Sequence, residues 1–314
     1  MIHFRKTFME LNVSVKEKKR FLSSAVQDKI VHYIFLLNGI FTVIILIGIF
    51  ALLFSTAIPT FKEVDLFGFL AGLEWNPTSY VKEQYGIVPM LVSTFMVTLG
   101  ALAIAIPIGI GAAAYLSDVA SPKVREIVKP VVELLAGIPS VVIGFLGIVI
   151  VGPFLAKVFG LYNGLNALNG SILLAVMALP TIISISEDAL SSVPQSYDQA
   201  SLALGASKWQ TVVRVKIPAA LSGIIAACML GMGRAIGETM TVLMATGCAP
   251  AMPESFLGPV RTLTSTIAIE LGEVAYNTTH YYALFAVGLV LFIITFIVNF
   301  ISDTILHRYE KVHR

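Results

Sequence analysis

A polar stretch between two long apolar segments says most about this chain: Gln199-Ala200-Ser201, three residues, Gly205, nine residues, and then Val215-Lys216-Ile217-Pro218. In a chain that crosses a membrane, an amphipathic segment of this length, interrupted by a glycine, is suited to docking a soluble protein. We therefore predict a docking segment within about residues 187–218. An ordinary helix-turn-helix without a docking role is the alternative for the same residues.

Composition indicates that the chain is embedded in a membrane. Of its 314 residues, 57 % are hydrophobic and 13 % are charged, whereas soluble domains carry about 25 % charged residues. Apolar runs of about 20 residues can cross a ~30 Å hydrocarbon core, and six such runs occur at 31–54, 87–115, 127–151, 170–186, 219–244 and 281–305. Lipid offers the backbone no hydrogen-bond partners, so these runs should be helices. We predict an all-α polytopic membrane protein with six transmembrane helices.

The distribution of Lys and Arg predicts the orientation of the chain. Sixteen of these residues lie in 1–30, 116–129, 187–218 and 306–314, and four lie in the alternate loops. Because Lys and Arg concentrate in cytoplasmic loops, both termini should face the cytoplasm. The expected domains are a cytoplasmic arm (1–30), a six-helix transmembrane domain (31–305) and a cytoplasmic tail (306–314). The net charge of +2 then reflects topology and gives no reason to expect a nucleic-acid partner.

A second motif, Gly231-Met232-Gly233-Arg234-Ala235-Ile236-Gly237-Glu238-Thr239, places charge inside the fifth predicted span. Arg234 would lie about 22 Å along a helix that starts near position 219. A charge at this depth is costly unless it faces a cavity or a partner. Glu238 comes four residues later, on the same helical face and within reach of Arg234. We predict that both residues line a substrate path; the alternative is a structural ion pair that no substrate contacts.

The glycines of this motif predict a close neighbour. Gly233 and Gly237 would form a Gly-x-x-x-Gly ridge that lets another helix approach closely. An arginine beside that ridge suits an oxyanion, because its planar guanidinium matches phosphate geometry. We therefore predict an anion path at an interface between subunits, with Gly233 and Gly237 at the helix contact.

The polar stretch resembles the EAA loop of ATP-binding-cassette (ABC) importer permeases, whose form is Glu-Ala-Ala, three residues, Gly, nine residues and Ile-x-Leu-Pro. Gly205 and Pro218 fall at the family spacing, while Gln199 replaces the Glu and Ser201 replaces the second Ala. The resemblance implies a short coupling helix that sits in a cleft of a cytoplasmic ATPase. Its residues in this chain would be Gln199, Ala200, Ser201, Gly205 and Pro218.

Further motifs narrow the resemblance to the permeases of the bacterial high-affinity phosphate importer. They are Gly-Arg-Ala-Ile-Gly-Glu-Thr, Leu135-Ala136-Gly137-Ile138-Pro139-Ser140-Val141-Val142, and Arg261-Thr262-Leu263-Thr264 followed by Ile267-Ala268-x-Glu270-x-Gly272-Glu273. The similarity runs from about 31 to 305. The long arm and a Trp-Asn-Pro loop before the second span resemble the PstC type of subunit. By position, Arg234 and Glu238 match the charged intramembrane pair that the family places on the phosphate path.

The resemblance implies the fold, the partners and the location. The fold would be that of a type I ABC importer permease in a bacterial cytoplasmic membrane, surrounded by membrane lipid. The partners would be a PstA-like permease in a heterodimer, two copies of a cytoplasmic ABC ATPase, and an extracytoplasmic phosphate-binding protein. The expected function is ATP-driven import of inorganic phosphate.

The chain should not hydrolyse ATP itself. A phosphate-binding loop needs Gly-x-x-x-x-Gly-Lys-Ser/Thr, and the nearest similar stretch, Gly205-Ala206-Ser207-Lys208, lacks the first glycine and is followed by Trp209. We expect no catalytic residue, no metal site and no cofactor on this chain, with ATP bound by partner subunits.

Other functions remain open. A permease for another oxyanion, such as sulfate, molybdate or phosphonate, would have the same general features. An ion-coupled secondary carrier or a channel could also use Arg234 and Glu238, but it would not need the EAA-like segment. An intramembrane enzyme is disfavoured, because the five histidines lie at span ends or in the tails and no predicted span holds two aspartates.

Overall fold

The computed structural model describes residues 24–312. Residues 1–23 of the predicted arm and the last two residues of the predicted tail lie outside this range. The chain divides into two units, residues 1–52 and 53–314. Within the described residues nearly all regular structure is helical, and the few strand residues form one two-stranded sheet. The prediction of an all-α membrane protein is confirmed.

The described part of the first unit is helix α2 (Ser24–Ala57), which continues a few residues into the second unit. It begins inside the predicted arm rather than at position 31. Every side chain from 28 to 52 is exposed. A long helix that is apolar on all sides and exposed on all sides suits a lipid environment.

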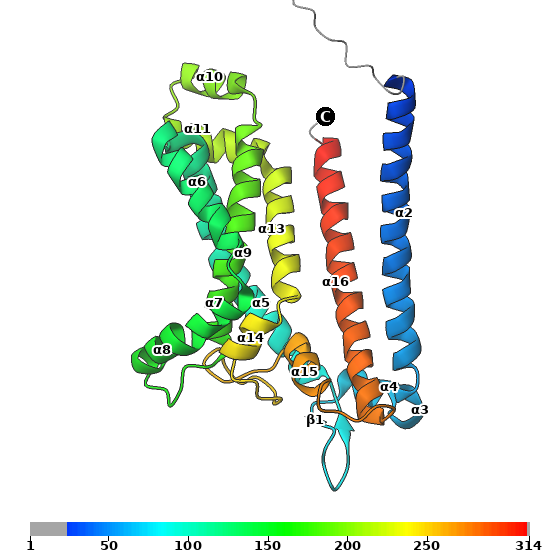
Figure 1. The fold of residues 1–314 in the computed structure, drawn as a ribbon. Helices are drawn as coiled ribbons and strands as arrows, with labels where there is room; N and C mark the ends of the chain where they lie inside the picture. Colours follow the sequence, from blue (N-terminus) through cyan, green and yellow to red (C-terminus); the bar gives the residue numbers. More distant parts are fainter. Residues whose placement is uncertain (1–23, 313–314) are drawn as a thin grey trace, which may run out of the picture. The chain divides into compact units, whose positions relative to one another are not determined.

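The second unit carries the remaining elements (Figure 1), which are α3 (Thr60–Glu63), α4 (Leu66–Ala71), β1 (Trp75–Asn76), β2 (Gln84–Tyr85), α5 (Val88–Ala114), η1 (Tyr115–Val119), α6 (Pro122–Ala136), α7 (Ser140–Leu146), η2 (Gly147–Val151), α8 (Gly152–Phe159), α9 (Ala167–Ser191), α10 (Gln195–Ala203), α11 (Lys208–Thr211), η3 (Val212–Lys216), α12 (Ile217–Ala219), α13 (Leu221–Ile236), α14 (Met240–Ala245), α15 (Leu263–Glu270) and α16 (Thr279–Val312). The η elements are π-helical turns. The strands pair antiparallel, Trp75 with Tyr85. In Figure 1, α10 and α11 lie at one end of α9 and α13, and α14, α15 and β1 lie at the other end.

Helices α5, α9 and α13 form the centre of the second unit. Their shared core is rich in alanine, and its fully buried members include Ala101 and Ala105 of α5 and Ala178 of α9. A side chain at Gly109 would bring its Cβ to 2.6 Å from Ile182. Membrane helices associate through such small residues, because lipid supplies no hydrophobic force between them and close packing must replace it.

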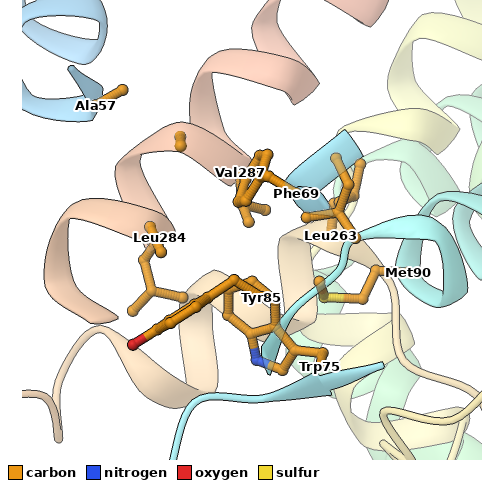
Figure 2. Packing of buried hydrophobic residues seen from close by; sticks show 11 residues of the cluster. Ala57, Phe69, Trp75, Tyr85, Met90, Leu263, Leu284 and Val287 are labelled. Carbon is orange, nitrogen blue, oxygen red and sulfur yellow. The ribbon is translucent and has the colours of Figure 1, made fainter. Parts of the chain in front are cut away.

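A second core closes the end of the unit that carries the sheet. Trp75 and Tyr85 meet edge to face with ring centroids 5.9 Å apart. Figure 2 shows these rings beside Leu284 and Val287 of α16 and Met90 of α5. The buried rings hold the hairpin against the starts of α5 and α16.

Five helices of the described chain are long and apolar enough to cross a membrane: Asp28–Glu63, Val88–Val119, Ser140–Phe159, Ala167–Ser191 and Thr279–Thr304. A sixth is counted if Lys208–Ala219 and Leu221–Ile236, which meet at an angle of 73°, form one bent span. Six predicted runs thus correspond to five or six observed spans.

The predicted third span, 127–151, is wrong in its limits. Helix α6 ends at Ala136, and a new helix starts at Ser140 after Gly137, Ile138 and Pro139. Pro139 is the N-cap residue of α7, with an extended ψ of 137°, and it lacks the backbone N–H that a continuing helix would need. The apolar span is therefore Ser140–Phe159, and α6 is a separate amphipathic helix.

The predicted fifth span, 219–244, is also interrupted. Helix α13 ends at Ile236, and α14 begins at Met240 after a break at Gly237–Thr239. Glycine is permissive for such a break, since it has the highest backbone entropy to lose in a helix. This break changes the geometry of the charged motif.

Candidate functional site

The predicted docking segment forms two short helices at one end of the second unit. Gln199, Ala200 and Ser201 lie on α10, with Gln199 and Ala200 exposed and Ser201 buried. Large apolar side chains nearby are exposed to a degree unusual for a polar loop: Leu204 at 90 % and Trp209 at 63 %. An exposed apolar patch of this kind is typical of a protein interaction site.

A glycine turn separates the two helices. Gly205 has φ +85°, and no atom lies within 4 Å of the place where a Cβ would stand. The backbone N–H of Ala206 donates to the carbonyl of Ser201 at 3.2 Å, and so closes α10. The turn needs glycine because its backbone is left-handed. A side chain at this position would have enough space.

Side-chain bonds fasten α10 to the next helix. The Ser201 and Thr211 hydroxyls are 2.9 Å apart. Ser207 caps α11 reciprocally with Gln210, which satisfies two backbone N–H groups at the helix start. Ser201, a departure from the family alanine, thus gives α10 a hydrogen bond that an alanine could not make.

Pro218 lies where the segment turns into the membrane. It is the second residue of α12, which follows the π-helical turn η3 and precedes the 73° bend into α13. Proline lacks the N–H of a regular helix and its ring crowds the preceding turn. A π-helical turn just before it widens the backbone there. The change of direction itself comes after Pro218, at Ala220, which lies between α12 and α13.

Arg234 lies in the last turn of α13, and its side chain is exposed. Among the described side chains, those of residues 28–304, its guanidinium has no hydrogen-bond or ion-pair partner. The C-terminal end of a helix favours a positive charge, but this is a weak substitute for a counter-ion inside a membrane.

The predicted ion pair between Arg234 and Glu238 is absent from the described residues. Because α13 stops at Ile236, Glu238 is not one turn further along the same helix. Its carboxylate instead accepts the backbone N–H of Thr241 at 3.3 Å, and its carbonyl accepts the Thr264 hydroxyl at 2.9 Å. Arg234 and Glu238 still border the same crevice. This crevice has no room for a water molecule, and its wall on α9 is formed by Leu174, Met177 and Ala178.

The tight contacts of α13 come from glycines other than those predicted. A Cβ at Gly223 would stand 2.4 Å from Ala189, and one at Gly231 would stand 2.8 Å from Ile182, so this face packs on α9. Gly233 instead lies beside Asn299 of α16, at an ordinary 3.5 Å. Gly237 is the C-cap residue of α13, so the expected helical ridge ends there. Their contact with a second subunit stays a prediction.

Glu270, the last residue of α15, joins three other segments at the opposite end of the unit. Its carboxylate accepts the Trp75 indole N–H at 3.0 Å and Arg261 Nη1 at 2.6 Å, and it lies 2.8 Å from His280 Nε2. Burial alone would raise the pKa of Glu270, but the bonds from His280 and Trp75 and the charge of Arg261 together hold that pKa below its usual value. Sequence reasoning did not foresee this cluster. The sequence did contain one indication of it, because Arg261 and Glu270 belong to the same motif.

A second buried carboxylate, Glu187 of α9, anchors α6. It forms ion pairs with Arg125 and Lys129, the latter at 2.6 Å. The hydrogen bond to Glu187 raises the pKa of Lys129 despite the opposing effect of burial. These bonds hold α6 against α9, although α6 ends at Ala136 and is not continuous with the next helix. Among the side chains that the structure describes, no three of His, Cys, Asp or Glu are grouped so as to hold a metal ion.

A bundle of membrane-length helices with a polar two-helix segment at one end and an exposed arginine on one helix has the architecture of a transport permease. The chain belongs to the family described as the binding-protein-dependent transport system inner membrane component, whose model matches residues 105–311. It is a multi-pass membrane protein with the fold of type I ABC importer permeases.

Two curated relatives and one solved structure illustrate the similarity. The chain is 41 % identical to the probable ABC transporter permease protein YqgH of Bacillus subtilis, over 73 % of this chain and 74 % of that protein. It is 33 % identical to the phosphate transport system permease protein PstC of Mesorhizobium japonicum, over 91 % and 92 %. A bacterial alginate ABC transporter, solved with an alginate-bound periplasmic protein, superposes with a TM-score of 0.60 at 15 % identity, over 92 % of this chain and 96 % of that one. The last likeness concerns the fold alone.

Proposed function

We propose that this chain is a permease subunit of an ATP-driven importer of inorganic phosphate. The observation that carries the proposal is Arg234, an exposed arginine in the last turn of the apolar helix α13 that has no partner among the described side chains, those of residues 28–304. Several relatives that align over most of the chain are phosphate transport permeases. An oxyanion is the ligand that a free guanidinium in such a place would best accept.

The exposure of Arg234 is the reason to expect a second permease subunit. A charge on an open helix face is stable in a membrane only if that face meets water or another protein. A PstA-like subunit would cover this face and enclose the phosphate path between the two permeases. The crevice beside Arg234 and Glu238 is closed to water in this chain, so the path would run along the interface and not through the single subunit.

Coupling to ATP would occur through α10. The exposed apolar side chains Leu204 and Trp209 beside the Gly205 turn offer a surface for a partner. By the Lys and Arg distribution, this end of the unit and both termini would lie in the cytoplasm. The partners there would be two ATPase copies, with the phosphate-binding protein on the opposite side. ATP would be bound by the ATPases.

Substrate choice tests the proposal directly. The complete transporter, with both permeases, the ATPase and the binding protein, is reconstituted into vesicles, and uptake of phosphate is compared with uptake of sulfate, molybdate and phosphonate. ATP-dependent uptake of phosphate in preference to the others is expected. Preferential uptake of a different oxyanion would overturn the substrate assignment, and uptake driven by an ion gradient without ATP would overturn the class.

A further inference from the structure

Lys216 is a buried lysine where three elements meet. It is the last residue of η3, and its side chain is only 8 % exposed. Its ammonium forms an ion pair with Asp118, on the π-helical turn that ends α5. A second ion pair, at 3.5 Å, joins it to Asp198 of α10. One side chain thus connects the exposed helix α10 with the end of a membrane-spanning helix.

The two aspartates depend on this single lysine. Asp118 Oδ2 and Asp198 Oδ1 are buried and have no partner within the described part of the chain. The side chain of Asp118 is 13 % exposed and that of Asp198 is 31 % exposed, so an opposite charge is needed most by Asp118. Because two carboxylates share one ammonium, a displacement of α10 that draws Asp198 away changes the field at Asp118 as well.

The position of Lys216 in the chain extends this connection to Arg234. After Lys216, α12 bends into α13, whose last turn carries Arg234. Asp118 follows α5, which packs along the length of α9. The Ser201–Thr211 bond also holds α10, but it reaches only α11. Through Lys216, α10 is therefore connected both to the end of α5 and to the segment that leads into α13.

We propose that Lys216 is the positioning residue that transmits movement of α10 to α5 and α13. The inference rests on the proposed function, in which α10 receives that movement from an ATPase. The EAA pattern leaves the position of Lys216 unspecified, since it corresponds to the x of Ile-x-Leu-Pro. The buried charge is thus a feature of this chain beyond the motif.

The test uses the complete transporter in vesicles and measures phosphate uptake and ATP hydrolysis together. Asp198→Asn removes the pairing to α10 and leaves Lys216 neutralised by Asp118. Lys216→Gln removes both pairings, and Lys216→Arg keeps the charge. Asp188→Asn is the matched control, because this exposed aspartate also pairs with a lysine, Lys129, at 3.1 Å. Co-purification measures how much ATPase each variant retains.

Asp198→Asn and Lys216→Gln should lower the phosphate imported per ATP hydrolysed by about tenfold, within the range known for coupling between sites. They should retain the ATPase, and Lys216→Arg and Asp188→Asn should resemble the unmodified protein. A normal import ratio in both Asp198→Asn and Lys216→Gln would overturn the inference. So would loss of the ATPase from Asp198→Asn, because α10 would then use Asp198 for docking.

A second measurement separates this inference from the identity of the substrate. In a variant with Cys228 and Cys248 replaced by alanine, a cysteine at the exposed position Leu230 of α13 reports its accessibility to a thiol reagent. Trapping the ATPase with ATP should change the labelling rate, and Lys216→Gln should abolish that change. If phosphate is not imported but ATP still alters labelling through Lys216, only the substrate assignment fails. An ATP-dependent change that persists in Lys216→Gln contradicts the role of Lys216.

Discussion

The Glu238 carboxylate accepts the backbone N–H of Thr241 at 3.3 Å, at the start of α14. It therefore stabilises the chain where α13 is interrupted, and no described side chain of this subunit supplies the neighbouring Arg234 with a counter-ion. The two charges of the motif thus have separate tasks. Glu238 supports the break in the helix, and Arg234 is available to another molecule.

Arg234 and Glu238 should therefore respond differently to the loss of charge. Arg234→Gln should reduce phosphate uptake severely while assembly with the ATPase is kept, because no bond within the described subunit depends on the guanidinium. Glu238→Gln should reduce uptake less, since the amide oxygen can still accept the Thr241 N–H. Uptake and co-purified ATPase are measured for both. Failure of Arg234→Gln to accumulate in the membrane would favour a structural role.

Gly205 should tolerate substitution according to backbone conformation rather than size. Its φ of +85° costs a residue with a side chain about 1–2 kcal/mol, and a β-branched residue is the least compatible with it. Gly205→Val should abolish uptake without preventing membrane insertion, whereas Gly205→Asn, which tolerates the left-handed region better, should retain much of it. Normal uptake and normal transport-stimulated ATP hydrolysis in Gly205→Val would show that α10 is not the coupling helix.

Gly231 should be essential for packing. A Cβ there would stand 2.8 Å from Ile182, so Gly231→Val should destabilise the folded subunit by about 1–3 kcal/mol through overpacking. Gly111→Ala on α5 is the control, because nothing lies within 4 Å of its Cβ position. Thermal unfolding of the purified protein distinguishes the two. Equal unfolding temperatures would contradict the close approach of α13 to α9.

Glu270 should make the free energy of unfolding depend on pH in the acid range. Because its pKa is lower in the folded chain than its usual 4.5, the stabilisation is complete above that value and is lost as the pH falls through the folded pKa. Glu270→Gln should lower the free energy of unfolding at neutral pH. In the variant this free energy should also fall less as the pH drops from about 5 to the folded pKa of Glu270. Unfolding measured across this range is the test. An unchanged acid profile in the variant would rule out this contribution.

A single type of permease should not be enough for transport. One subunit carries one α10 segment, while the importer class uses two such segments on two ATPases, and two facing arginines would balance a divalent phosphate better than one. Vesicles that contain only this permease, the ATPase and the binding protein should be inactive. Robust ATP-driven phosphate uptake in them would reveal a functional homodimer.

Composition and motif spacing were enough to predict the class of fold. The apolar runs must be helices in lipid whatever their packing, and the glycine of the EAA-like spacing, Gly205, has the positive φ of a turn. The limits of the third and fifth spans were wrong. Hydropathy alone does not register that Gly137-Ile138-Pro139 and Gly237–Thr239 end helices within apolar sequence.

The sequence by itself determined that the chain is helical and lies in a membrane, since apolar length and backbone hydrogen bonding act over neighbouring positions. Only the tertiary structure decided which polar groups meet. Lys216 with Asp118 and Asp198, and Glu270 with Trp75, Arg261 and His280, are brought together from distant segments. A salt bridge depends on the distance between two charges in space, and that distance is set by helix packing and by the breaks that redirect the chain. The same reason explains why Arg234 lacks the partner that its spacing from Glu238 suggested.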